Sequence, residues 1–292
     1  MNWFALATVS ALLSAAAAVA QKRVLFRTAA LEFAFLVSVV TLALSAWVPA
    51  KLDVFAFDAR TLGLLAFKSV ISGIAFLLVM KALERNELSN ALPMLGLTPA
   101  LVAVLAQFVL HQPLRGAEWG ALALMVTGTT LLESRDGAAL AQSWRDAWRD
   151  GRHKYVGGAL ALFAFSAIAD KLLVSGMKVP PFVVLVHQHV VYVVLFGAML
   201  AVRRTTFAAL AARTREHWPL LLTIGLLTIG YRWFQLLATK AGPVALVLAT
   251  KRTSIVYASL AGGSLFKEQR VLVRVAGAAL IVAAGFLLLG RE

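Results

Sequence analysis

The sequence contains no cysteine among its 292 residues, and only 14% of the residues are charged. Without cysteine the chain has no disulfide framework, no thiol nucleophile and no cysteine-based metal site. A soluble domain carries about 25% charged residues, so a chain this poor in charge has more apolar surface than one soluble core can bury. The composition therefore favours a protein that uses the lipid bilayer as its solvent.

Acidic residues are also scarce: 14 Asp and Glu stand against 28 Lys and Arg, and the formal net charge is +14. Such an excess is typical of nucleic-acid-binding proteins, but no basic patch here is interleaved with aromatic residues, so we expect no nucleic-acid partner. In a membrane protein, the cations gather instead in the loops that stay in the cytoplasm.

Long apolar runs are what the sequence has in abundance, with 61% hydrophobic residues and a mean hydropathy of +0.83. A membrane-spanning helix needs about 20 predominantly apolar residues. We therefore expect an all-α, multi-pass protein of the cell (inner) membrane with ten transmembrane helices. The predicted spans are 2–21, 31–50, 62–81, 88–110, 117–133, 155–174, 181–202, 217–238, 242–265 and 271–289.

The distribution of cations around these spans predicts an orientation. The odd-numbered connections hold 17 Lys and Arg, whereas the even-numbered connections and the two tails hold 6. The positive-inside rule then places the odd connections in the cytoplasm and both termini outside.

The spans divide into two halves, residues 1–134 and 155–292, with a polar linker at 135–154. The halves look alike: Val19-Ala20-Gln21-Lys22 aligns with Ile168-Ala169-Asp170-Lys171. A unit of five spans is odd, so its second copy must enter the membrane from the opposite side. The sequence therefore predicts two inverted five-helix repeats, a plan known from transporters.

The last span of each half carries a pair of glycines, Gly120 and Gly128 in the fifth and Gly277 and Gly285 in the tenth. Small residues at this spacing give a helix a face that allows close packing. Two arrangements fit: the fifth and tenth helices pack within their own chain, or they form the seam of a homodimer.

Residues 245–268, ALVLATKRTSIVYASLAGGSLFKE, and the glycine-containing final span resemble the last two helices of EamA-type transporters in the drug/metabolite transporter (DMT) superfamily. The first half departs from that pattern at His111-Gln112-Pro113, where the family has an acidic residue. The resemblance implies a secondary transporter with no cofactor and no ATP site. It also implies a central cavity lined by the first four helices of each half, and cytoplasmic termini, contrary to the charge count.

Two adjacent cations, Lys251 and Arg252, fall about ten residues, or about 15 Å, into the ninth predicted span. Ionisable residues at such depth are costly and point to function. Adjacent cationic donors suit a carboxylate or phosphate, so we expect a small, polar, anionic metabolite as substrate. The structural alternative is pairing with an internal acid such as Glu32 or Asp170. The resemblance adds that the phosphate-translocator branch uses an adjacent Lys-Arg in its ninth helix, but its fourth-helix Lys is missing here.

Four further residues complete the predicted substrate-binding set: Ser254, Tyr257, Tyr231 and Arg232. The first two add hydroxyl groups beside Lys251. Arg232 stands among aromatic residues on the eighth span, a pattern that fits a cavity wall and an interfacial anchor equally well.

Glu32, His187 and His189 are candidates for proton coupling, because a carboxylate and imidazoles in a cavity can carry protons. The alternative is that they are polar residues satisfied at helix starts. Lys68 on the third span fits either a cavity cation or a snorkelling side chain.

Lys22 and Lys171 occupy equivalent positions near the ends of the first and sixth spans. We expect a shared structural role for them, either snorkelling or capping helix carbonyls. Asp170 is predicted to pair locally with Lys171.

An integral-membrane enzyme and a lipid translocator are the main rivals to a metabolite transporter. The pair His187 and His189 is a weak metal motif with no HExxH or cysteine to support it, so we expect neither a metal nor enzymatic activity. Buried cations would also suit an anionic lipid or lipid-linked headgroup, which is the alternative substrate. The expected partners are therefore a small-molecule substrate and membrane lipids.

Overall fold

The computed structural model describes residues 2–47, 52–84, 97–133 and 154–254, together with 257, 276, 277, 279–281, 283, 284 and 287. Across these ranges the chain is helical and has no β-strand, which confirms the predicted all-α fold. The polar linker up to residue 153, the start of the fourth predicted span at 88–96 and most of the tenth lie outside the described residues.

The helices of the first half lie at the predicted spans but differ from them at their ends. They are α1 (Trp3–Leu25), α2 (Ala30–Leu44), α3 (Ala59–Glu84), α5 (Thr98–Val109) and α6 (Gly116–Glu133). Asn2 begins α1 by accepting a hydrogen bond on its side chain from the Phe4 amide at 3.0 Å. Pro99 stands in the first turn of α5, where its missing N–H leaves no hydrogen bond unmade.

The second half repeats this order. It contains α8 (Lys154–Lys171), which continues as the π-helical turn η2 (Leu172–Gly176), then α9 (Pro181–Val202), α10 (Phe207–Ala241) and α11 (Val244–Arg252). The described residues between 276 and 287 are also helical. Prolines at 180, 181 and 243 set the starts of α9 and α11, as their fixed φ suits the entry to a helix.

Several predicted spans have different bounds in the structure; α2, for example, ends at Leu44, whereas its span was predicted to reach residue 50. The helix α10 has 35 residues and begins at Phe207, ten residues before the predicted start at 217. A helix of this length measures about 52 Å and exceeds the hydrocarbon core, so one end must project or lie along the surface. The helix α11 ends at Arg252 with a turn at Thr253, whose amide bonds back to the Thr250 carbonyl. Ser254 and Tyr257 are helical again, and most of the remainder of the predicted span 242–265 lies outside the described residues.

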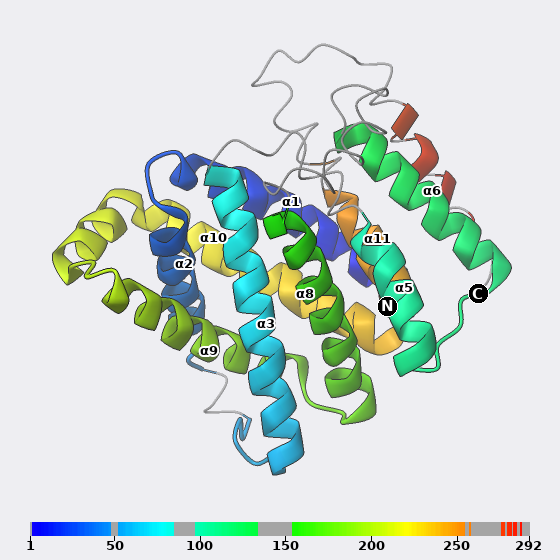
Figure 1. The fold of residues 1–292 in the computed structure, drawn as a ribbon, viewed down its shortest axis with the longest axis horizontal. Helices are drawn as coiled ribbons and strands as arrows, with labels where there is room; N and C mark the ends of the chain where they lie inside the picture. The colour runs from blue at the N-terminus through cyan, green and yellow to red at the C-terminus, as the bar shows by residue number, and fades with distance from the viewer. Residues whose placement is uncertain are drawn as a thin grey trace.

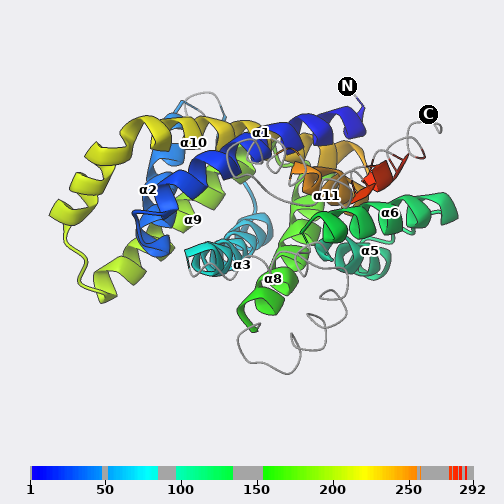
Figure 2. The same cartoon turned by 90° about the horizontal axis from the view of Figure 1, so that it is seen from above.

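The two halves pack on each other in a reciprocal pattern (Figures 1 and 2). The first helix of each half contacts the third helix of the other: α1 packs on α10, and α8 packs on α3. The second helices α2 and α9 contact each other, as do the fourth helices α5 and α11. Reciprocal contacts of this kind are what a two-fold relation between duplicated units produces.

The glycine face of α6 is packed inside the chain at Gly128 but not at Gly120, where nothing lies within 4 Å of an added Cβ atom. A Cβ atom added at Gly128 would lie 2.7 Å from the carbonyl oxygen of Gly277 and 2.8 Å from Cγ1 of Ile281. In Figures 1 and 2, α6 lies beside the red C-terminal segment at one edge of the molecule. Of the two predicted arrangements, internal packing is therefore present at Gly128, and a homodimer through these helices stays a prediction.

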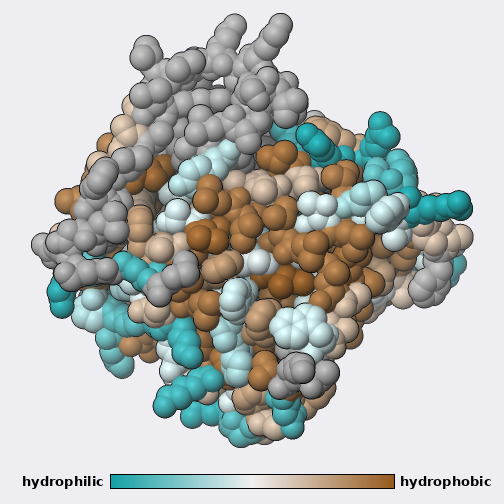
Figure 3. Space-filling model, turned by 180° about the vertical axis from the view of Figure 1, so that it is seen from behind, coloured by the Kyte–Doolittle hydropathy of each residue, from teal (hydrophilic) through white to brown (hydrophobic). Residues whose placement is uncertain are grey.

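The outer surface carries many large apolar side chains. Phe108 is 72% exposed, Val194 67% and Leu226 60%. Figure 3 shows a broad apolar area across one face of the molecule, with hydrophilic side chains at its margins. Five described helices are long and apolar enough to cross a membrane by length and composition, and α2 and α5 are shorter apolar helices. A bilayer accounts for this surface, which water would penalise.

Candidate functional site

A cavity of about 250 Å³ lies between the two halves. Four helices of each half line it, namely α1, α2, α3 and α5 with α8, α9, α10 and α11, whereas α6 contributes no lining residue. This is the arrangement that the resemblance implied.

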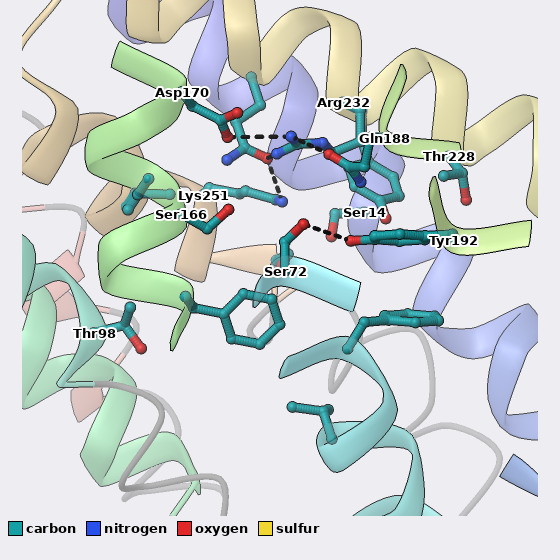
Figure 4. A pocket seen from close by; sticks show the side chains of 18 of the residues that line it. Ser14, Ser72, Thr98, Ser166, Asp170, Gln188, Tyr192, Thr228, Arg232 and Lys251 are labelled. Carbon is teal, nitrogen blue, oxygen red and sulfur yellow. Dashed lines mark hydrogen bonds and ion pairs between the residues drawn. The ribbon is translucent and has the colours of Figure 1, made fainter. Parts of the chain in front are cut away.

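Asp170 stands at the centre of an ion network on the cavity wall (Figure 4). Its Oδ1 lies 3.0 Å from Nζ of Lys68, and its Oδ2 lies 3.1 Å from Nη2 of Arg232. All three side chains are buried, and Lys68 comes from the first half whereas the other two come from the second. The carboxylate therefore neutralises cations on both sides of the repeat interface, which lowers the cost of burying them.

The prediction that Asp170 pairs with Lys171 was wrong. Adjacent residues of a helix point about 100° apart, so the two side chains leave α8 in different directions. Lys171 donates to the carbonyl oxygens of Thr239 at 2.7 Å and Gly242 at 3.0 Å, at the end of α10. These acceptors belong to a helix terminus, so the predicted capping of helix carbonyls is confirmed for Lys171.

Two glutamine side chains hold the cavity cations in place. The Gln188 Oε1 accepts from Arg232 at 2.7 Å and also from Lys68. The Gln235 Oε1 accepts from Lys251 at 2.6 Å and from Arg232 at 3.1 Å. An amide oxygen orients a cation without cancelling its charge. Neither glutamine was among the predicted site residues, although the i,i+3 spacing of Arg232 and Gln235 on one helix was a signal for the second.

Lys251 and Arg252 form the last turn of α11. Nζ of Lys251 lies 4.6 Å from the centre of the Tyr231 ring, and Nη2 of Arg252 donates to the Thr98 hydroxyl at 3.1 Å. The negative end of the helix dipole favours cations at this position. Among the described residues no ion pair joins Lys251 to an acid, because Asp170 contacts Lys68 and Arg232 instead.

Most of the predicted substrate-binding set lines the cavity. The residues found there are Lys251, Arg252, Tyr231, Arg232 and Ser254. Tyr257 is described but is not a lining residue, and its amide donates to the Thr253 carbonyl at 3.3 Å. Of the two locations predicted for Arg232, the structure shows the cavity wall. The side chain faces the cavity and is 9% exposed, unlike an anchor at the membrane interface.

The proton-coupling candidates are separated by the structure. His189 lines the cavity, and its Nδ1 lies 2.9 Å from the Leu185 carbonyl oxygen. His187 points elsewhere and packs on the Phe55 ring at 5.4 Å, while Glu32 lies in the first turn of α2 and does not line the cavity. Within the described ranges no group of three His, Asp or Glu is placed to hold a metal ion. The proton-coupling roles stay predictions.

Aromatic and hydroxyl groups form the part of the wall opposite the ion network in Figure 4. The Tyr192 hydroxyl donates to Oγ of Ser72 at 3.0 Å, and the Tyr192 ring stacks on Phe76 at 6.2 Å. These residues come from α9 and α3, so they also join the two halves. The cavity therefore combines a cationic region with an aromatic one.

Two donors in the cavity wall have no acceptor within the described part of the chain, the Thr228 hydroxyl and Nε of Arg232. The two other nitrogens of Arg232 are bonded to Asp170, Gln188 and Gln235. A buried N–H left unpaired costs about 1–3 kcal/mol. A ligand oxygen at this point would remove that cost.

Comparison with known proteins found a solved structure of similar fold and a family that matches the first half of the chain. A crystal structure with 16% sequence identity superposes with a TM-score of 0.77 and covers 99% of this chain and 98% of that chain, which shows a common fold. No curated protein matches the sequence. The sequence resemblance rested mainly on residues 245–268, whereas the family match falls on the other half. Residues 1–134 match the EamA-like transporter family, a family of multi-pass membrane transporters in the drug/metabolite transporter superfamily.

Proposed function

We propose that the protein is a secondary transporter, an exporter or exchanger, of a small organic anion across the cell (inner) membrane. The charge around the cavity carries this proposal. Arg232, Lys251 and Arg252 line it, and Asp170 is the single acidic side chain among the described lining residues. Burying cations away from water is costly, and an anionic substrate offsets that cost.

The donors are also close enough to act on one group. Arg232 and Lys251 both bond to Oε1 of Gln235, at 3.1 and 2.6 Å. A carboxylate or phosphate oxygen beside this amide would accept from Nε of Arg232 and from Lys251 together. Hydrogen bonds between charged partners are the strong ones, so two of them would select anions over neutral solutes.

The size of the cavity supports a soluble substrate. A cavity of about 250 Å³ has room for a whole compact metabolite. The alternative substrate, an anionic lipid or lipid-linked headgroup, would place only its headgroup among these residues.

Alternating access is the mechanism that the arrangement favours. The cavity lies between the halves, and the pairs Lys68–Asp170 and Thr98–Arg252 cross from one half to the other. Rocking of the halves would break and remake such contacts and expose the cavity to each side of the membrane in turn.

The test is uptake into proteoliposomes. A thermal-shift screen with carboxylates, phosphorylated metabolites, organic cations and neutral solutes first selects the anion that stabilises the protein most, which then serves as the uptake probe. Lys251→Gln and Arg252→Gln should each weaken its apparent affinity at least about tenfold, because a charged hydrogen bond contributes about 1.5–3 kcal/mol. Lys240→Gln is the matched control, since Lys240 is exposed and outside the cavity lining.

Two results would count against the proposal. One is stabilisation by cations or neutral solutes without any effect of anions. The other is unchanged affinity in both Lys251→Gln and Arg252→Gln.

A further inference from the structure

Asp170 lines the cavity, whereas Lys68, the cation closest to its carboxylate, does not. Lys68 is 0% exposed and does not line the cavity, so it lies behind the wall. Asp170 lines the cavity and reaches both Lys68 and the cavity-facing Arg232, at 3.0 and 3.1 Å. Its negative charge therefore acts on the same volume that a bound anion would occupy.

The equivalent position in the first half is Gln21, which aligns with Asp170 and also lines the cavity. The two halves thus place corresponding side chains, Gln21 and Asp170, in the same cavity, and only Asp170 is charged. Replacing a carboxylate by the amide of the same length, or the reverse, changes the charge and hardly changes the shape. Substitutions at these two positions can therefore add or remove one negative charge with little change in packing.

We propose that Asp170 is a fixed counter-anion that sets how much negative charge a substrate must carry. The inference rests on the proposed function, because it requires an anionic substrate. A buried charge acts over several ångströms in a low-dielectric site, so Asp170 repels a bound anion while it partly neutralises Arg232. Each additional negative charge on the substrate meets this repulsion, and the wild-type cavity therefore discriminates against higher anions.

The experiment compares probes that differ by one charge on the same carbon skeleton. The pairs are succinate with succinamate and phthalate with phthalamate, at a pH where every carboxylate is ionised. Apparent affinities are measured by competition for uptake in proteoliposomes and by thermal shift of the purified protein. The quantity of interest is the ratio of dianion affinity to monoanion affinity.

Two nearly isosteric variants should move this ratio in opposite directions. Asp170→Asn removes the fixed charge and should raise the preference for the dianion by at least about tenfold. Gln21→Glu adds a negative charge at the equivalent position and should lower it. Asp170→Glu keeps the charge and is the matched control, for which the ratio stays close to that of the wild type.

The outcomes separate a selectivity role from a structural one. If Asp170 only holds the helices together, Asp170→Asn weakens both members of each pair equally and the ratio does not change. An unchanged ratio in Asp170→Asn and Gln21→Glu overturns the inference, and if Asp170→Asn fails to fold, Gln21→Glu alone decides. Failure of every anion in the thermal-shift screen to stabilise the wild type would instead overturn the proposed function.

Discussion

Replacement of Gly128 by alanine tests the contact that joins the last described helix of each half. The new Cβ would stand 2.7 Å from the Gly277 carbonyl oxygen, 2.8 Å from Ile281 and 3.2 Å from Leu280. An ordinary carbon-to-oxygen contact is about 3.3–3.6 Å, so the backbone must move by roughly half an ångström. The first obstacle is backbone rather than a flexible side chain, so the two helices have to separate.

The expected change in unfolding free energy on Gly128→Ala is the sum of two opposed effects. Overpacking of a close contact costs about 1–3 kcal/mol. Alanine is better than glycine in a helix by about 1 kcal/mol, and this gain offsets part of the loss. Gly120→Ala on the same helix gains the same helix propensity without overpacking, because nothing lies within 4 Å of its added Cβ. The difference between the two variants should therefore equal the overpacking cost.

The assay is thermal unfolding of the purified protein, followed by the fluorescence of its seven tryptophans. A free-energy difference of 1 kcal/mol moves the unfolding midpoint by about 2–4 °C in a chain of this size class, so Gly128→Ala should unfold at least about 2 °C below Gly120→Ala. Equal midpoints for the two variants would refute the reasoning and leave the glycine face available for contact between two copies of the chain.

Three further predictions follow from the structure. Lys171→Met leaves the carbonyls at the end of α10 without their donor and should destabilise the protein by about 1–3 kcal/mol, measured by thermal unfolding; no change would contradict the capping role. Tyr192→Phe removes the hydrogen bond to Ser72 and should cost about 0.5–1.5 kcal/mol in the same assay, whereas a stabilised variant would mean that this bond contributes nothing. Because the chain has no cysteine, Arg204→Cys and Lys178→Cys report orientation: a membrane-impermeant thiol reagent added to cells should modify only the second, and the reverse pattern would favour cytoplasmic termini.

Much of the fold could be predicted from the sequence because the bilayer imposes a simple pattern. Long apolar runs must become helices, since only a helix satisfies its own backbone polar groups in lipid. The run at 181–202 coincides with α9 in the structure, and the others differ mainly at their ends. The turn at Thr253 inside the ninth predicted span escaped prediction because hydropathy does not report local changes in backbone hydrogen bonding.

The cavity was predicted in part. Lys251, Arg252 and Arg232 stood out because a charge in an apolar run is costly, and all three line the cavity. Asp170 and Lys68 stood out less, because each sequence neighbourhood offered a local explanation. Their contact joins positions far apart in the chain, and no periodicity within either helix contains that information.

The sequence by itself determined that the chain is an all-helical membrane protein built from two related halves, because hydropathy and duplication are properties of the linear order of residues. Only the tertiary structure decided which charges share one space. Asp170 contacts Lys68 and Arg232 rather than its neighbour Lys171, and Gly128 meets Gly277. The physical reason is that ion pairing and close packing depend on distances of a few ångströms between helices, and these distances are fixed only when the two halves pack together.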